Sequence, residues 1–263
     1  MDAPHGDGDE LLVERQDGIV TVTLNRPQRK NAVTPSMWAA LLDTFNAIAA
    51  SDTDRVVIVT GAGGDFCSGA DLGAPDATAG HGLARMRRIG AACLALHNLP
   101  QPTIAKVPGV AVGAGLNMAM ACDLVVASTE ARFSEIFARR GLSVDFGGSW
   151  LLPRRLGMHR AKELLLLAEI LDATEAERLG LVNRVLDPAE LDGFVDDWAR
   201  RLAAGPPIAL SMTKKLVNNA FATTLEQALE EEAMAQTVNF STADTNEAVQ
   251  AFLSKREPRF EGR

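Results

Sequence analysis

The chain has 263 residues, 47% of them hydrophobic, and a formal net charge of −8. This length supports a sizeable core in one or two domains, and the acidic balance disfavours a nucleic-acid partner. No apolar run approaches the roughly 18 residues of a membrane span, and the acidic N-terminus lacks the apolar stretch of a signal peptide, so neither a membrane anchor nor secretion is expected.

The first predicted elements are two strands, a helix and a third strand. Residues 11–16 and 18–25 have strand character, and an Asp-Gly turn joins them. Residues 34–51 carry apolar residues at helical spacing behind an N-cap threonine and a first-turn proline. Residues 55–61 are rich in β-branched residues, which is typical of a buried strand.

The middle of the chain continues to alternate between helices and strands. Residues 82–99 are predicted to form a helix that ends before a proline. Residues 103–115 contain a strand, a turn and a Gly/Ala-rich entry into a helix at 116–123, and a further strand follows at 124–128. Strands that alternate with helices indicate an α/β core.

After about residue 148 the pattern becomes mainly helical, with one short strand near residues 181–186. The C-terminal helices have broad apolar faces that a small lobe would not bury alone. We therefore expect them to form a packing and oligomerisation unit. We therefore divide the chain into a disordered tail (1–9), an α/β core (10–200) and a C-terminal helical oligomerisation region (201–263).

Common cofactor and nucleophile motifs are missing from the sequence. The three cysteines are widely spaced and the four histidines form no zinc pattern, so we expect no metal site and a reducing, cytoplasmic setting. The stretch after residues 55–61 begins like a dinucleotide fingerprint, but Phe66 occupies the third glycine position. The chain has no tyrosine for short-chain dehydrogenase chemistry, no P-loop and no GxSxG motif.

Two strand-to-helix junctions consist of small residues, at 66–72 (FCSGADL) and at 109–123 (GVAVGAGLNMAMACD). Glycine and alanine let the backbone approach a ligand closely, and N–H groups in the first turn of a helix are unpaired. Two such turns facing each other would bind one oxygen as an oxyanion hole, commonly worth about 3–4 kcal/mol per donor in the transition state. The alternative is tight helix–sheet packing without a ligand.

Both junctions belong to a set of five ordered blocks that resembles the crotonase superfamily, the enoyl-CoA hydratase/isomerase family. The blocks are LNRPQRKNAV (24–33), FCSGADL (66–72), AGLNMAMACDLVVAS (114–128), GLSVDFGGSWLLPRRLG (141–157) and AFLSKREPRF (251–260). The resemblance spans nearly the whole chain and is more specific for the superfamily than for the reaction. It implies an α/β spiral of ββα units with a C-terminal helical trimerisation region, and hence a homotrimer or a dimer of trimers.

The resemblance also implies an acyl-CoA substrate and no separate cofactor, because coenzyme A is part of the substrate. The backbone N–H groups of Ala70 and Ala114 would form the oxyanion hole that polarises the thioester carbonyl and stabilises an enolate. Hydratases of the family activate water with two glutamates, whose positions correspond here to Asn117 and Phe137. Neither residue can act as a base, so that mechanism is unsupported. Phe137 is expected to shape an apolar acyl pocket, whereas Asn117 orients substrate or water, or only caps local backbone.

Asp145 aligns with a position where some family members keep a catalytic aspartate. The combination of Asn117, Phe137 and the block at 141–157 resembles most the branch of phenylacetyl-CoA epoxide isomerases. A carboxylate in an apolar pocket has a pKa raised toward neutrality, which suits proton transfer, so Asp145 is a candidate general base and acid. The alternative is that its side chain caps the following helix by binding the N–H of Gly147 or Gly148.

The phosphates of coenzyme A require positive charge, which the first block and the C-terminal block supply. In the family, the equivalents of Phe252 and Lys255 come from a neighbouring subunit. Each cation taken singly could equally be an ordinary solvated side chain. The candidate substrate-binding and CoA-binding residues are Arg26, Arg29, Lys30, Ser68, Ala70, Asp71, Leu72, Phe137, Phe252 and Lys255.

Three hypotheses follow from these residues. The first is a cofactor-independent isomerase that uses Ala70, Ala114 and Asp145. The second is an enoyl-CoA hydratase in which Asp145 or Glu135 activates water. The third is a catalytically inert acyl-CoA binder that keeps the oxyanion hole.

The acyl group cannot be read from the sequence, although three regions are expected to shape its pocket. Phe146 and Trp150 flank the candidate aspartate and supply aromatic surface, as Phe137 does. The polar segment at 73–86 stands close to the first oxyanion motif and is a candidate mobile lid.

Overall fold

A twisted, mainly parallel sheet forms the centre of the computed structural model, which describes residues 10–73 and 81–263. The predicted tail at 1–9 lies outside the described residues. The strands of this main sheet run in the order β1 (Leu11–Gln16), β2 (Ile19–Leu24), β3 (Val56–Gly61), β4 (Thr103–Val107), β6 (Leu124–Ser128) and β9 (Arg184–Leu186). β1 and β2 form the predicted antiparallel hairpin, whereas the remaining neighbours pair in parallel.

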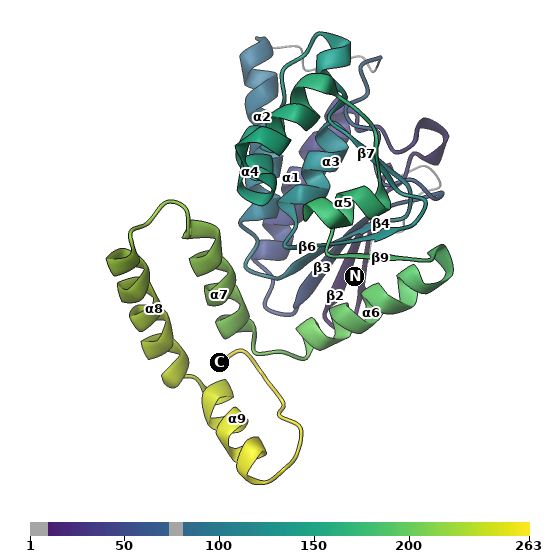
Figure 1. The fold of residues 1–263 in the computed structure, drawn as a ribbon. Helices are drawn as coiled ribbons and strands as arrows, with labels where there is room; N and C mark the ends of the chain where they lie inside the picture. Colours follow the sequence, from purple (N-terminus) through teal and green to yellow (C-terminus); the bar gives the residue numbers. More distant parts are fainter. Residues whose placement is uncertain (1–9, 74–80) are drawn as a thin grey trace.

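Helices cover both faces of the main sheet (Figure 1). Because side chains alternate along β3, Val57 and Val59 join the larger hydrophobic cluster on one face, and Val56 and Ile58 join a smaller cluster on the other. The smaller cluster is completed by α6 (Pro188–Ala203). The larger cluster is completed by α1 (Pro35–Ala49), α2 (Gly82–His97), α3 (Ala114–Ala121), α4 (Gly148–Leu167) and α5 (Ala173–Leu179).

A second, smaller sheet was not predicted as a separate unit. It consists of β5 (Val110–Val112), β7 (Arg132–Ser134) and β8 (Leu171–Asp172). Strands of two or three residues are too short to show a recognisable alternation in the sequence. Parallel bridges from Cys67 to Ala111 and from Val33 to Ala70 bring three distant segments together at this sheet. The two small-residue junctions therefore lie side by side.

Two helix boundaries show how local sequence sets the fold around the site. Thr34 caps α1 as predicted, because its hydroxyl accepts a hydrogen bond from the Met37 N–H at 3.2 Å. The helical region predicted after about residue 148 begins with α4, which bends at Gly157, where φ is 72°. Two 3-10 turns complete the core, η1 (Pro27–Arg29) and η2 (Ile136–Arg140).

The C-terminal helices α7 (Pro207–Asn219), α8 (Leu225–Phe240) and α9 (Ala243–Leu253) extend away from the core (Figure 1). The predicted boundary at residue 200 falls in the last turn of α6. Lys214 of α7 is tied to the core through its Nζ atom, which lies 2.8 Å from the Asp123 carboxylate. Among the described residues, no helix combines the length and apolar character that crossing a membrane would need.

Candidate active site

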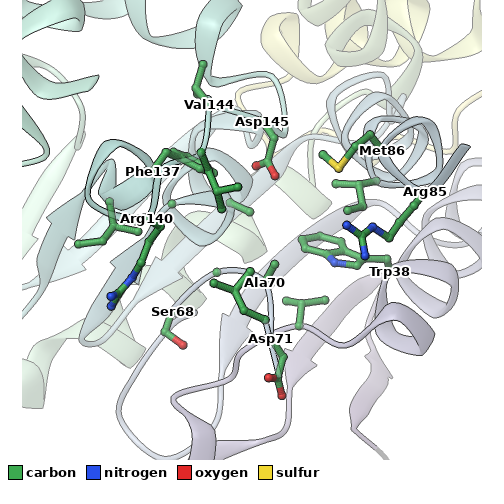
Figure 2. Close-up of a pocket in the computed structure, with 18 of the residues that line it drawn as sticks. Trp38, Ser68, Ala70, Asp71, Arg85, Met86, Phe137, Arg140, Val144 and Asp145 are labelled. Carbon is green, nitrogen blue, oxygen red and sulfur yellow. The ribbon is translucent and has the colours of Figure 1, made fainter. Parts of the chain in front are cut away.

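A cavity of about 770 Å³ lies between α1, α2, η2 and the loop before α4 (Figure 2). Its size falls within the range that is usual for small-molecule sites. Seven of the predicted site residues line it: Ser68, Ala70, Asp71, Leu72, Ala114, Phe137 and Asp145. The first four come from the junction after β3, and Ala114 begins α3. With Val33 from the block at 24–33, the fold thus gathers four of the five sequence blocks around one cavity.

The backbone N–H groups of Ala70 and Ala114 both border the cavity. In the bridge at Ala70, the Val33 N–H binds the carbonyl of Gly69 and the Asp71 N–H binds the carbonyl of Val33, so the Ala70 N–H is not part of the bridge. Ala114 is the first residue of α3, where the helix offers no acceptor for its N–H. Neither N–H donates a hydrogen bond within the described part of the chain. Both donors are therefore available to a ligand.

Glycines let these two segments approach at backbone distance. A Cβ added at Gly69, whose φ is 98°, would lie 3.7 Å from the Ala114 N atom and 3.0 Å from the Val112 carbonyl oxygen. A Cβ at Gly115 would lie only 2.3 Å from the Cys67 carbonyl oxygen, closer than non-bonded atoms can stand. The glycines at these positions are thus needed for the N–H groups of Ala70 and Ala114 to lie side by side.

Asp145 enters the cavity from the loop between η2 and α4, on the opposite side from Ala70 (Figure 2). The hydrogen bond that closes the turn before α4 runs from the Gly148 N–H to the Asp145 backbone carbonyl, at 3.1 Å. The expected alternative, a side-chain cap by Asp145, is wrong, because α4 has no side-chain cap. The Asp145 Oδ1 atom has no hydrogen-bond partner within the described residues. Burial raises the pKa of this carboxyl from its ordinary 3.8 to about 6.

Asn117 does not line the cavity, so its prediction as a catalytic residue needs correction. Its side chain is fully buried on α3, and its Nδ2 atom donates to the Asp145 backbone carbonyl at 2.9 Å. A Cβ added at Gly148 would lie 2.5 Å from the same Nδ2 atom, which shows how tightly the loop packs on Asn117. Asn117 is therefore placed to position the Asp145 loop, as the backbone-capping alternative foresaw.

Glu135 lies behind Asn117 and is completely buried. The Asn117 Nδ2 atom also stands 3.4 Å from the Glu135 Oε2 atom. Burial, reinforced by the negative charge of Asp145, raises the pKa of the Glu135 carboxyl from 4.5 to about 9, although the contact with Asn117 acts in the opposite direction. The only sequence signal for this residue is an acid among apolar neighbours in the stretch RFSEIF.

None of the cations predicted to bind coenzyme A lines the cavity: Arg26 belongs to the scaffold, whereas Arg29 and Lys30 are exposed on the surface. Arg26 is largely buried, and it contacts the carboxylates of Asp71 and Glu10, each at 3.0 Å. The hydrogen bond from Arg26 is the main reason that the pKa of Asp71 is lowered. Lys30 lies 3.5 Å from Asp65, and Arg29 accepts the Ser68 hydroxyl on its backbone carbonyl at 3.2 Å.

Phe252 and Lys255 lie at and just beyond the end of α9 and do not line the cavity of their own chain. Phe252 is 83% exposed. Figure 1 shows α9 at the far end of the molecule from α1 and α2. A role for these residues in CoA binding thus requires another subunit, as the resemblance implied, and stays a prediction.

Two aromatic residues expected around the acyl group lie elsewhere. Phe146 points into the core and packs against Trp38, with ring centroids 5.2 Å apart. Trp150 is on the surface, where the Arg154 guanidinium lies 3.8 Å from its ring centroid. The position of Trp150 follows from α4 beginning at Gly148, whereas Phe146 lies before the helix in a left-handed backbone conformation, with φ of 46°. The expectation that they line the acyl pocket is therefore wrong.

Several lining residues were not anticipated individually. Arg85 and Met86 come from the segment predicted as a lid, of which residues 74–80 lie outside the described residues. Figure 2 shows Arg85 close to Trp38 at one side of the cavity and Arg140 on the other side. Helical spacing alone does not show which turn of a surface helix borders a cavity. The further lining residues include Trp38, Arg85, Met86, Arg88, Ile89, Arg140, Leu142 and Val144.

Comparison with known proteins agrees with this arrangement. Residues 14–263 match the enoyl-CoA hydratase/isomerase family. The chain is 37% identical over 262 residues to the 1,2-epoxyphenylacetyl-CoA isomerase of Escherichia coli (strain K12), with 96% of this chain and 98% of that protein covered. It is 38% identical over 255 residues to a probable enoyl-CoA hydratase of Rhodobacter capsulatus, with the same coverage.

Solved structures support the same relationship. The chain is similar to the putative enoyl-CoA hydratase from Streptomyces coelicolor A3(2), with a TM-score of 0.92, 36% identity and coverage of 100% of this chain and 98% of the other. An enoyl-CoA hydratase from Mycobacterium smegmatis gives a TM-score of 0.89 and 35% identity, with 96% and 99% covered. The crotonase-like α/β fold predicted from the five sequence blocks is thus confirmed.

Proposed function

The chain belongs to the enoyl-CoA hydratase/isomerase family and is an acyl-CoA-processing enzyme, and from this premise we propose that it is an isomerase that shuttles a proton with Asp145. The observation that carries the proposal is the Asp145 carboxylate, which enters the cavity opposite Ala70 with one oxygen unpaired. Asp71, the other acid that lines the cavity, is bound to Arg26 and is not available as a base.

The chemistry begins with the thioester oxygen in the oxyanion hole. Two N–H donors, from Ala70 and Ala114, polarise the carbonyl, and Asp145 removes a proton from a carbon near it. The C–H electrons form the enolate and an O–H bond forms on Asp145. The O–H bond then breaks as the proton returns to a different carbon, and the double bond has moved. Atoms balance without water, a redox partner or a cofactor, and such a proton shuttle contributes about 10²–10⁴ in rate.

Hydration is the alternative, and the names of several relatives favour it. The two-glutamate mechanism of the family is unsupported here, because an amide and a phenyl ring, Asn117 and Phe137, stand in the glutamate positions. Glu135 does not line the cavity, and Asn117 lies between it and the Asp145 loop. A hydratase would thus have to activate water with Asp145 alone. The third hypothesis, an inert acyl-CoA binder, is disfavoured by the enzyme names of the relatives.

A substrate of the phenylacetate type is part of the proposal. The relative from Escherichia coli is named as a 1,2-epoxyphenylacetyl-CoA isomerase. The cavity offers a suitable apolar wall, formed by Trp38, Met86, Ile89, Phe137 and Val144. Flat apolar side chains of this kind complement a ring or a medium-length acyl chain. We therefore place ring-containing thioesters first among the candidate substrates.

The assembly and setting are proposed on the same basis. We propose a homotrimer or a dimer of trimers in the cytoplasm, with no nucleic acid and no membrane as partner. Support comes from the exposed apolar residues of α7, α8 and α9, and from Phe252 and Lys255, which lie too far from the cavity of their own chain to contact its ligand. A neighbouring subunit would bring the latter two to the coenzyme A.

The test is a panel of 2-enoyl-, 3-enoyl- and ring-epoxide CoA thioesters in D₂O, followed by mass spectrometry. Isomerisation gives a rearranged product without the mass of a water, and deuterium enters it whenever the proton on Asp145 exchanges with solvent before it returns. Asp145→Asn lowers turnover by about 10²–10⁴ while thioester binding persists. Asp43→Asn, the same change on an exposed position of α1, is the matched control and keeps full turnover. A product heavier by one water supports the hydratase, and binding without turnover of any thioester supports the inert binder.

A further inference from the structure

Two carboxyl groups and one amide form a cluster at the wall of the cavity, in which Glu135 and Asn117 are fully buried and Asp145 borders the cavity. Glu135 follows β7, Asn117 lies on α3, and Asp145 precedes α4. The Asn117 Nδ2 atom is 3.4 Å from the Glu135 Oε2 atom and 2.9 Å from the Asp145 backbone carbonyl. A single amide thus connects the element that holds one acid with the loop that holds the other.

Several polar atoms of the cluster form no hydrogen bond within the described residues. The Oδ1 atom of Asn117, the Oε1 atom of Glu135 and the Oδ1 atom of Asp145 are buried and unpaired within the described residues. No lysine or arginine of the described residues forms a salt bridge with either acid. Two buried carboxylates without a cation repel each other, so only one of the pair can readily carry charge.

Other groups around the pair do not change this balance. Cys93 of α2 approaches the Asp145 loop, with its Sγ atom 3.4 Å from the Phe146 carbonyl. Burial and the charge of Asp145 raise the pKa of this thiol to about 11, so it stays uncharged at the pH of the cell. Arg85, Arg88 and Arg140 line the cavity and are exposed to solvent, and none forms a salt bridge with Glu135 or Asp145. The choice of the charged member therefore depends on Glu135 and Asp145 themselves.

We propose that Glu135 is the proton-holding member of a carboxyl pair with Asp145, a positioning residue that keeps Asp145 as the only charged member of the pair and supports it through Asn117. This inference rests on the proposed role of Asp145 as the base. Asp145 borders the open cavity, whereas Glu135 is completely buried, so solvation favours charge on Asp145. The protonated Glu135 can also donate its hydroxyl to an unpaired oxygen of the cluster, which a carboxylate could not do.

The arrangement sets an upper pH limit for the enzyme. When Glu135 loses its proton, near pH 9, a second charge stands beside Asp145. This charge opposes the formation of the anionic enolate in the cavity, so kcat/KM should fall by roughly tenfold per pH unit above that point. Below it, activity follows the ionisation of Asp145, near pH 6. The pair thus defines the pH range in which the site works.

The first test is a direct titration that needs no turnover. Glutamate labelled with ¹³C at the side-chain carboxyl is incorporated, and the Glu135 resonance is identified by its loss in both Glu135→Gln and Glu135→Asp, so that either variant suffices if the other does not fold. The expected result is titration of Glu135 near pH 9 in the wild type and at a distinctly lower pH in Asp145→Asn, which lacks the opposing charge. Titration at an ordinary glutamate pH, or no change in Asp145→Asn, would overturn the inference.

The second test uses the pH dependence of kcat/KM. Glu135→Gln should lose the alkaline fall and keep the acid limb, whereas Glu169→Gln, the same change at an exposed position, should keep both limbs. An alkaline fall that persists in Glu135→Gln contradicts the inference. If Asp145→Asn retained full turnover, the proposed function would fail, yet the titration would still decide whether the two carboxyls are coupled. The two failures are therefore distinguishable.

Discussion

The α/β core buries its large apolar residues, whereas the C-terminal helices leave many of theirs exposed. In the core, large side chains such as Phe45, Phe66 and Phe133 are completely buried, and buried acids are confined to a few positions that include the candidate site. In α7 and α8 no residue is buried. The exposed apolar residues of the C-terminal helices include Val217, Phe221, Leu225, Leu229, Met234, Val238, Phe240 and Phe252. The core completes its own packing, whereas the C-terminal helices leave apolar surface exposed, which supports the proposed assembly.

The pattern along α8 sharpens this contrast. Helical spacing places Leu225, Leu229 and Phe240 on one face, and Met234 and Val238 on the opposite face. A helix that is apolar on two sides needs contacts on both, and a single chain supplies neither in full. The comparison teaches that one chain contains the groups of the proposed proton transfer, whereas it leaves both apolar faces of α8 without full cover.

The largest expected effect concerns the self-sufficient core. Gly115→Ala places a Cβ 2.3 Å from the Cys67 carbonyl oxygen and forces the two oxyanion segments apart. We expect a loss of about 3 kcal/mol in the free energy of unfolding together with a loss of turnover. Gly193→Ala on α6, where a Cβ meets nothing within 4 Å, is the control and should be neutral or stabilising by up to about 1 kcal/mol. Denaturant unfolding and turnover check both, and wild-type behaviour of Gly115→Ala would refute the close contact.

A second prediction tests the partner surface of the C-terminal helices. The double change Leu229→Glu and Phe240→Glu puts two charges on one apolar face of α8, and desolvating them should prevent assembly. Light scattering after gel filtration should report a smaller species, and the KM for thioesters should rise if a neighbour supplies Phe252 and Lys255. Glu231→Gln, on the same helix, should leave the assembly intact. An unchanged mass for the double variant would show that this face is not an interface.

A third prediction concerns the stability cost of the charged acid. Burial raises the folded-state pKa of Asp145 from 3.8 to about 6. The stability that follows from this shift is fully present below pH 3.8, where the carboxyl is neutral in both states, and is lost as the pH rises through 6, where the folded protein must carry the charge. Asp145→Asn cannot become charged, so above pH 6 it should unfold with a free energy about 1–3 kcal/mol larger than that of the wild type. The difference should shrink towards pH 4. Urea unfolding at several pH values measures it, and a less stable variant at neutral pH would contradict the burial argument.

The smallest effects come from matched helix caps in the two regions. Thr34→Ala removes the cap of α1 and Thr224→Ala removes the capping box of α8. We expect Thr34→Ala to lower the free energy of global unfolding by about 1 kcal/mol. Thr224→Ala should mainly accelerate amide exchange in the first turn of α8, by about fivefold, because that helix has few contacts with the core. Equal global losses for both variants would mean that α8 unfolds together with the core.

Sequence reasoning predicted those features that depend on local patterns. The hairpin at Asp17, the cap at Thr34 and the two junctions at Ala70 and Ala114 follow from turn residues, capping residues and small residues at fixed spacing. The resemblance of the ordered blocks then gave the fold and pointed to Asp145. These signals are readable because each depends on a few neighbouring residues.

The remainder depends on contacts between distant segments. The small sheet that contains β5, β7 and β8 is built from strands too short to show a pattern. The cluster of Asn117, Glu135 and Asp145 unites three elements, and nothing in the order of residues shows which acid is buried more deeply. Trp150 was misplaced because the exact first residue of α4 decides which way its side chain points.

The proposed oxyanion hole depends on the main chain, which affects how such a protein can change over time. Its two donors are main-chain N–H groups, so every residue type except proline preserves them at positions 70 and 114, provided that Gly69 and Gly115 keep the segments close. Mutation can therefore exchange the acids around the cavity, such as Asp145, without dismantling the means of activating a thioester. The backbone donors thus persist through mutation, whereas the acids around the cavity are replaceable. An engineer could introduce new reactions by substituting these acids alone.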